Sequence, residues 1–285
     1  MKTLPLSILL ITALALGACD KQITLQLDSP PSRLVIEGGI ERVKDNPDGR
    51  QIIVLSTLND FFEPDQTPRV TDASVSVSNE RGQSWSFVHN NAVPGQYEAE
   101  NLIGEVGEAY TLTIDWNGDR YSATTEMTGV APIERVYQFF EESNAFEDGG
   151  LKVAIDFTDP AGNENFYFWQ LFQDGQNLIT PDPGNSGNII AKDEFWDGQT
   201  IEGYLPSEER VFEPGDEVLV RHIGISQEYF DFLFLLFEQT GQTGQLIDVP
   251  PALIRGNAGN LTNPDNFPVG YFWASEVDEK TIVIE

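Results

Sequence analysis

Residues 73–88 read ASVSVSNERGQSWSFV. Serines alternate with valines up to residue 78, the turn signal Asn79 to Gly82 follows, and Trp85 and Phe87 then share one side of a second run. An alternation with a period of two predicts half-buried β-strands, because successive side chains of a strand point to opposite faces. The stretch therefore predicts two strands joined by a tight turn, each with one face in a core.

The same pattern extends in both directions from this stretch. Short apolar runs predict further strands at residues 34–40, 51–58, 95–99, 110–116 and 121–124. Turn signals separate these runs every ten or so residues, and no helix signal interrupts them. Seven short strands with this spacing are typical of an immunoglobulin-like β-sandwich, which we expect over residues 32–128. We also expect this block to fold alone, because each strand should find its partners within it.

After residues 129–132, which have the composition of a short linker, the chain predicts a second module over residues 133–285. This β-rich (α+β) module is expected to contain one buried helix at residues 226–239, capped by Ser226 and stopped by Gly241. The apolar residues of this helix lie around nearly its whole circumference, so the helix should be buried against a sheet. Strands are expected at residues 133–140, 151–157, 166–172 and 218–225, with a closing pair at 271–274 and 281–284. The strand at 166–172 should be buried on both faces.

The first residues have the pattern of a bacterial lipoprotein signal. Lys2 is the only charge before Cys19, and an apolar run over residues 4–16 ends in Leu16-Gly17-Ala18-Cys19, which resembles a lipobox. We expect residues 1–18 to be a signal peptide, Cys19 to be lipidated, and residues 19–31 to be a lipidated tether. The alternatives are an ordinary signal peptide with a chance cysteine and a buried cysteine in an N-terminal helix. Lipid chains on Cys19 would supply stable membrane attachment.

Charge and cysteine content exclude several classes of function. The chain has 16 Lys and Arg against 46 Asp and Glu, a formal net charge of −30. Such a polyanion repels the phosphate backbone, so no nucleic-acid partner is expected. The single cysteine excludes an intrachain disulfide, a cysteine-based zinc site and an iron–sulfur cluster. The acidic residues are scattered without a long run, as on a solvated surface.

Catalytic motifs are missing from the sequence, and we expect neither an enzyme nor a cofactor. The two histidines, His89 and His222, form no His-Glu-x-x-His motif, and both should be surface or strand-end residues. There is no Gly-x-Ser-x-Gly elbow and no phosphate loop. The aromatic clusters at residues 166–169 and 271–273 should lie in a core or, alternatively, line a sugar- or peptide-binding groove.

One loop carries a candidate metal site. Oxygen-bearing side chains gather within seven residues ahead of a strand, at Asp159, Asn163, Glu164 and Asn165. Such side chains could hold Ca²⁺, which prefers oxygen ligands. The alternative is a turn in which Asp and Asn side chains bond the backbone. No other metal site is expected.

Several fragments, in order along nearly the whole chain, carry a resemblance to a family. They are the lipobox, RLVIEG at 33–38, ASVSV at 73–77, PGQY at 94–97, GEAYTL at 107–112, FTDPAGNENFY at 157–167, RGN at 255–257 and VGYF at 269–272. Together they resemble a family of uncharacterised Bacteroidota outer-membrane lipoproteins, domains of unknown function usually encoded beside TonB-dependent receptors. The resemblance implies a lipid anchor in the outer membrane, facing the periplasm or the outside, and a TonB-dependent receptor as partner. It implies no catalytic residue.

These observations lead to one main expectation of function and two alternatives. We expect a non-catalytic outer-membrane lipoprotein that is an accessory or substrate-capturing partner of a TonB-dependent transporter. Contact should run through the long loops at residues 174–200 and 241–268, because loops of that length commonly carry function. The alternatives are a cell-surface adhesin or structural interaction protein, and a hydrolase with a carboxylate pair.

Overall fold

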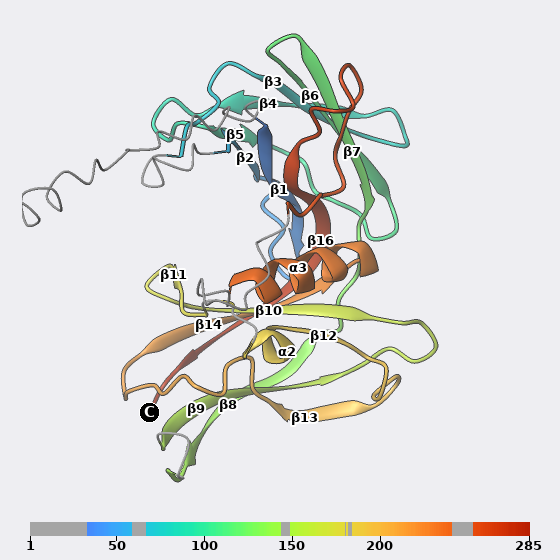
Figure 1. Ribbon diagram of the computed structural model, residues 1–285. Coiled ribbons are helices and arrows are strands. Elements are labelled where there is room, and N and C mark those ends of the chain that lie inside the picture. The colour runs from blue at the N-terminus through green and yellow to red at the C-terminus, as the bar shows by residue number, and fades with distance from the viewer. Residues whose placement is uncertain (1–32, 59–66, 144–148, 180, 182–183, 241–252) are drawn as a thin grey trace, which may run out of the picture. The chain divides into compact units, whose positions relative to one another are not determined.

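The computed structural model describes residues 33–285 except 59–66, 144–148, 180, 182–183 and 241–252 (Figure 1). The chain divides into residues 1–31 and residues 32–285, and the fold described below is that of the second unit. The expected signal peptide, Cys19 and the tether therefore lie outside the described residues. The fold is mainly β, as the sequence predicted. Among the described residues, no helix is long and apolar enough to cross a membrane.

The first seven strands have the order of an immunoglobulin constant-type sandwich. The order β1-β2-β5-β4 makes one layer and β3-β6-β7 the other, and every pair among these strands is antiparallel. These are the layers ABED and CFG of that fold. Strand β4 also pairs with β3, which joins the two layers along one side. The strands are β1 (Leu34–Val43), β2 (Gln51–Thr57), β3 (Ser74–Asn79), β4 (Ser84–His89), β5 (Gln96–Ala99), β6 (Ala109–Trp116) and β7 (Asp119–Glu126).

A first core fills the space between these layers. The valines of β3, Val75 and Val77, are buried in it, whereas the serines between them are partly exposed. Phe87 of β4 is buried beside them, and Trp85 is only half-buried. Alternation along the sequence thus places one face of each strand in this core, as expected. Tyrosines with buried rings complete it, at Tyr97, Tyr110 and Tyr121.

The expectation that the strands of this block find all their partners within it is wrong for β1 and β7. The last strand, β16 (Val269–Val283), pairs in parallel with β1, and the short β15 (Gly259–Asn260) pairs with β7. Strand β1 is an edge strand in the immunoglobulin order, so its free backbone groups can accept another strand. Phe272 and Ala274 of β16 belong to the first core.

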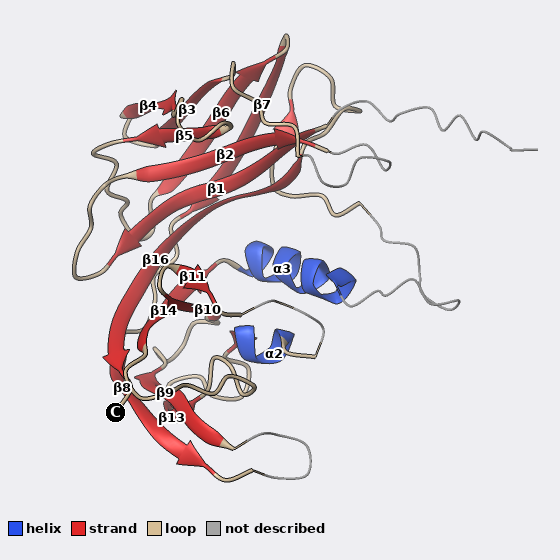
Figure 2. Ribbon diagram, turned by 90° about the vertical axis from the view of Figure 1, so that its left-hand side faces the viewer, coloured by secondary structure: helices blue, strands red, loops and turns tan. Residues whose placement is uncertain are grey.

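Strand β16 also corrects the expected closing strand pair, because it is one strand of 15 residues. Its second half leaves β1 and pairs antiparallel with β14 (Glu217–Ile225). Figure 2 shows it curving from one sheet region into the other. The charged residues near its middle have a composition typical of a turn, yet Glu276 and Asp278 are buried and paired. Lys44 binds Glu276, and Asp278 accepts a 2.6 Å hydrogen bond from the backbone of Ile133.

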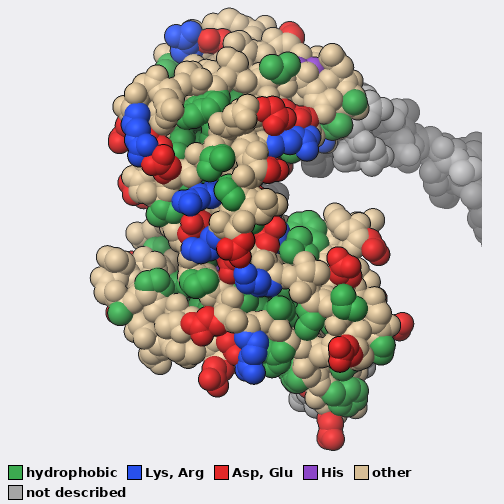
Figure 3. Space-filling model, turned by 180° about the vertical axis from the view of Figure 1, so that it is seen from behind, with side chains coloured by type: hydrophobic (Ala, Val, Ile, Leu, Met, Phe, Trp, Pro, Cys, Tyr) green, Lys and Arg blue, Asp and Glu red, His purple; other side chains and the backbone are tan. Residues whose placement is uncertain are grey.

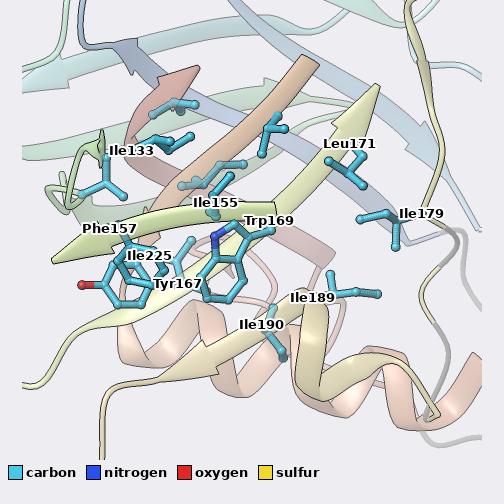
Figure 4. Packing of buried hydrophobic residues seen from close by; sticks show 14 of the residues in the cluster. Ile133, Ile155, Phe157, Tyr167, Trp169, Leu171, Ile179, Ile189, Ile190 and Ile225 are labelled. Carbon is cyan, nitrogen blue, oxygen red and sulfur yellow. The ribbon is translucent and has the colours of Figure 1, made fainter. Parts of the chain in front are cut away.

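A second core lies in the remaining strands, between β9 and β10 (Figure 4). One sheet has the order β13-β9-β8, and β10 lies beside β14 in the large sheet. Tyr167, Trp169 and Leu171 of β10 are buried, but Phe168 and Phe172 are only half-buried, so this strand is not buried on both faces. The strands are β8 (Ile133–Glu141), β9 (Gly150–Thr158), β10 (Phe166–Gln173), β11 (Gln176–Asn177), β12 (Ile190–Lys192) and β13 (Thr200–Tyr204).

The predicted helix is present as α3 (Gln227–Thr240), after the short α2 (Ser186–Ile189). The hydroxyl of Ser226 accepts a hydrogen bond from the backbone N–H of Tyr229 at 3.2 Å, which confirms the expected cap. The helix is buried on one side only. Phe234 and Leu235 remain 44% and 52% exposed, because the sheet covers a single face of α3.

The segment at residues 129–132 is not an open linker. Val130 and Ala131 are buried, and the backbone of Val130 bonds Lys44 and Glu276. A Cβ added to Gly224 would lie 2.1 Å from the carbonyl oxygen of Gly129, so the backbones approach as closely as glycine allows. The chain therefore passes from the first core to the second through packed structure.

Candidate functional site

A groove of about 460 Å³ lies between α3 and the face of β1 and β16 that points away from the first core. Figure 2 shows α3 near the bend of β16, across from β1. Most of the lining side chains are apolar. We refer to this feature as the α3 groove, and its main lining residues are Val35, Glu37, Tyr229, Phe232, Leu233, Leu236, Gln239, Leu253, Ile254, Tyr271 and Trp273.

Two local periodicities build the α3 groove. On α3, Tyr229, Leu233 and Leu236 are spaced by four and three residues, which places them along one stripe of the helix. On β16, Tyr271 and Trp273 point to the groove, whereas Phe272 between them points into the first core. Of the two aromatic clusters predicted from sequence, residues 271–273 line the groove in part, and Tyr167 and Trp169 of residues 166–169 are buried core.

Three aromatic rings stack at the base of the α3 groove. The ring of Tyr229 lies 4.6 Å from that of Tyr271 and 5.5 Å from that of Trp273, and the planes of Tyr229 and Trp273 differ by 4°. A Cβ on Gly39 would come within 2.7 Å of the Trp273 indole, so this glycine makes room for the indole. Burial raises the pKa of Tyr271 to about 12.

A second hollow, of about 360 Å³, adjoins the first over β1 and β2. We refer to it as the glycine hollow, because Gly38 and Gly39 are among its lining residues. Its lining includes Ile52 and Val54 of β2, and it shares Glu37 and Trp273 with the α3 groove. The two hollows therefore meet at one carboxylate and one indole.

The two glutamates of this face differ in their partners. Glu41 forms an ion pair with Arg221 and accepts a hydrogen bond from the Trp273 indole nitrogen at 3.3 Å. Arg221 is held in turn by Glu279, at 2.8 Å. Glu37 is exposed and has no hydrogen-bond or ion-pair partner among the described residues. Sequence reasoning missed Glu37, because nothing in a strand pattern marks which exposed acid lies between apolar neighbours.

The residues of the predicted calcium loop have different surroundings in the structure. Asp159 is buried and accepts hydrogen bonds from the Tyr167 hydroxyl and from the backbone N–H of Gly198. Asn163 and Glu164 are exposed. Asn165 is half-buried, and its side-chain amide nitrogen lies within hydrogen-bond distance of the carbonyl oxygens of Pro160 and Asn163 in the orientation that satisfies both. This last contact is the kind expected of a turn.

The carboxylates that lie beside Asp159 come from a distant turn, at Asp193 and Asp197. Carboxylate oxygens of Asp159, Asp193 and Asp197 all lie within 4.8 Å of one another. Burial and the neighbouring acids raise the pKa of Asp193, while the backbone N–H of Asn165 opposes this effect. A divalent cation would relieve the repulsion among three carboxylates. The spacing Asp193-x-x-x-Asp197 is a sequence signal for this pair, but nothing in the sequence brings it to Asp159.

The two histidines have different surroundings. His89 lies at the end of β4 and accepts a 3.2 Å hydrogen bond from the backbone of Gly95, as expected of a strand-end residue. His222 contradicts that expectation, because it lies within β14 and is fully buried in the second core. It stacks on Trp169, with 5.2 Å between ring centroids. Burial, with the charge of Lys44, lowers the pKa of His222 to about 3.

The fold defines a class of protein: a mainly β chain in which an immunoglobulin-order sandwich and a second core share the strand β16. Within that class, the chain belongs to the family described as "Domain of unknown function (DUF4249)", which matches residues 20–281. No curated protein matches the chain. Among solved structures, it is similar to the crystal structure of a DUF4785 family protein from Legionella pneumophila, with 13% identity and a TM-score of 0.24. That match covers 66% of this chain and 52% of the other, so the chain spans about half of its length.

Proposed function

We propose that this protein is a non-catalytic outer-membrane lipoprotein, anchored through Cys19, that acts as an accessory or substrate-capturing partner of a TonB-dependent receptor. The lipobox at residues 16–19 supports the anchor. The family resemblance of the sequence supports the outer membrane and the receptor. The α3 groove is the surface that we assign to the interaction.

The observation that carries the proposal is the exposed apolar surface beside the α3 groove. Leu236 and Leu253, which both line the groove, are 39% and 49% exposed. An apolar groove with exposed side chains in its lining marks an interaction site, because contact of such surface with water is unfavourable. Of the loops expected to make contact, residues 241–252 lie outside the described residues, while Leu253 and Ile254 line the groove.

The distribution of charge agrees with an interaction that is local rather than spread over the surface. Figure 3 shows acidic and basic side chains interleaved across the middle of one face. Ion pairs such as Lys44 with Glu276 and Lys280 with Asp45 neutralise part of the acidic charge. An exposed pair such as Lys280 with Asp45 contributes little free energy, so a specific partner needs the apolar surface as well.

The anchor is tested by Cys19→Ser in the native host. Metabolic labelling with an alkyne palmitate should mark the wild-type protein and not the variant, and the variant should remain unprocessed. Equal labelling of both proteins would contradict the anchor.

The partner is tested by affinity purification of a tagged protein from mild-detergent extracts. A receptor of large-barrel size should be recovered with the wild type and lost with Leu236→Glu, which places a charge in the lining of the α3 groove. Val93→Glu is the matched control, because Val93 is similarly exposed, at 46%, but lies in the turn between β4 and β5. If no receptor is recovered where it is expressed, the adhesin or structural role takes the place of this proposal.

A further inference from the structure

Glu37 lies where the α3 groove and the glycine hollow meet, without a partner among the described residues. We infer that this surface binds a polypeptide segment of the partner protein in which a basic side chain is flanked by apolar ones. The basic group binds Glu37 beside the rings of Tyr271 and Trp273, and the flanking side chains fill the two hollows. The inference rests on the proposed function and names the chemistry of the partner.

Strand register places Glu37 between apolar neighbours. On β1 it lies opposite Tyr271 of β16 on one side and opposite Val54 of β2 on the other. The next residues along this face are Gly39, Trp273 and Ile52. A lone carboxylate in such surroundings attracts a cation, because a charge-assisted hydrogen bond and the faces of aromatic rings both favour one.

A carboxylate, a cation and an aromatic ring occur together elsewhere in this protein. The guanidinium of Arg135 forms an ion pair with Asp156 at 2.6 Å and lies 4.2 Å from the ring centroid of Tyr137. Near the groove, Glu41 has its internal cation in Arg221. Glu37 has the carboxylate and the aromatic neighbours of these sites but no cation paired with it among the described residues, so it is free to bind a cation supplied by the partner.

The charge of the whole chain favours the same partner chemistry. With 46 acidic and 16 basic residues, the protein attracts basic segments and repels acidic ones. Complementary charge of this kind sets specificity and association rate more than affinity. The affinity would come from the apolar side chains on either side of the basic group.

The walls of the two hollows favour a polypeptide over a glycan or an acyl chain. Apolar side chains dominate the walls of the α3 groove, where Glu37 and Gln239 are the charged and amide side chains of the described lining. The glycine hollow adds Glu41, Arg50 and Gln51, but Glu41 pairs with Arg221, Arg50 pairs with Glu98, and Gln51 bonds backbone carbonyls. A glycan needs many more available hydrogen-bonding groups than these walls offer. An acyl chain would cover the Glu37 carboxylate without compensating its charge, which is unfavourable.

The test uses the lipidated protein in nanodiscs and a fluorescein-labelled peptide, GVLRLVG, with blocked ends. A second peptide carries citrulline in place of arginine, which removes the charge and keeps the shape. Fluorescence polarisation should show at least tenfold tighter binding of the arginine peptide by the wild type. Glu37→Gln should abolish this preference, and Glu37→Arg should reverse it toward a peptide with glutamate in place of arginine.

Glu80→Gln is the control, because it removes the same charge from an exposed turn between β3 and β4. Equal binding of the arginine and citrulline peptides by the wild type, or a preference that persists in Glu37→Gln, would overturn the inference. If cis-parinaric acid binds equally to the wild type and to Glu37→Gln, and neither protein binds a peptide, the groove would be assigned to acyl chains instead.

The outcomes also separate this inference from the proposed function. If a receptor copurifies with the wild type but the arginine peptide shows no Glu37-dependent binding, the inference fails alone. If the peptide binds through Glu37 but no receptor is recovered, the receptor role fails and the basic-peptide site remains. Because Glu37 is exposed, its variants should unfold at the wild-type temperature, which excludes misfolding as the cause of lost binding.

Discussion

Oε2 of Glu276 lies 2.8 Å from Nζ of Lys44 and 3.2 Å from the backbone nitrogen of Val130. The same Nζ donates to the carbonyl oxygen of Val130 at 3.0 Å, so the three groups close a ring of contacts. Lys44 follows β1, Glu276 lies in β16, and Val130 lies in the crossing between the two cores. Side chains far apart in sequence thus hold together the point at which the chain leaves the first sandwich.

We expect Glu276→Ala to lower the free energy of unfolding by about 2–4 kcal/mol, because it leaves a partly buried ammonium and a buried N–H without their partner. Urea unfolding followed by circular dichroism measures this loss. Asp45→Ala is the matched control: Asp45 is 80% exposed, and its ion pair with Lys280 is on the surface. Its loss should cost at most about 1 kcal/mol. Equal effects of the two substitutions would contradict a structural role for Glu276.

The first sandwich was predictable because its signals are local. Each strand there alternates with a period of two, and turn residues separate the strands, so residues 73–88 already indicate the hairpin that the structure contains. Ser226 and the apolar run after it gave the position of α3 for the same reason. These signals depend only on neighbours along the chain.

The path of β16 could not be predicted, because its signals are not local. The run Ser275-Glu276-Val277-Asp278-Glu279 has the composition of a turn, and only distant partners such as Lys44 and Ile133 make its buried charges acceptable. The α3 groove depends on this path, since β16 brings Tyr271 and Trp273 to α3 and beside Glu37. A site assembled by one long-range strand therefore has no compact motif in the sequence.

Phe272→Ala tests whether β16 is part of the first core. Phe272 is fully buried there, so its truncation should cost about 3–5 kcal/mol of unfolding free energy. Phe234→Ala is the control, and should cost less than about 1.5 kcal/mol because Phe234 is 44% exposed. Chemical denaturation measures both. We also expect a fragment of residues 32–128, which lacks β16, to melt without a sharp transition; a cooperative melt like that of the full chain would show that β1 does not need β16.

The acidic cluster makes a prediction about calcium. Three carboxylates within 4.8 Å of one another disfavour the folded state when all are ionised, and a bound divalent cation would reverse this effect. Millimolar Ca²⁺ should therefore raise the melting temperature of the wild type by a few degrees. Asp197→Asn keeps an oxygen that can accept from the backbone N–H of Gly162 but removes one charge, so it should reduce this response. If both proteins respond equally to Ca²⁺, the cluster does not bind the ion.

The last prediction concerns acid stability and His222. Both ring nitrogens of His222 are buried without a hydrogen-bond partner among the described residues, and the ring lies directly across the strand pair from Trp169. Burial, reinforced by the charge of Lys44, lowers the folded-state pKa to about 3 from an ordinary value of 6.5. Below pH 6.5 the unfolded chain binds a proton here that the folded chain does not. This stabilising contribution is therefore complete above pH 6.5 and is lost as the pH falls toward 3.

His222→Phe should reduce that dependence on pH, because phenylalanine keeps a ring against Trp169 and removes the titrating group. Urea unfolding at steps between pH 7.5 and pH 4.5 measures the effect. Relative to the variant, the wild type should lose up to about 1.4 kcal/mol for each pH unit below 6.5, since one pKa unit corresponds to that free energy. The carboxylates that titrate over the same range are common to both proteins and cancel in the difference. A difference that stays constant from pH 7.5 to 4.5 would mean that the imidazole of the folded protein takes up its proton as readily as that of the unfolded chain.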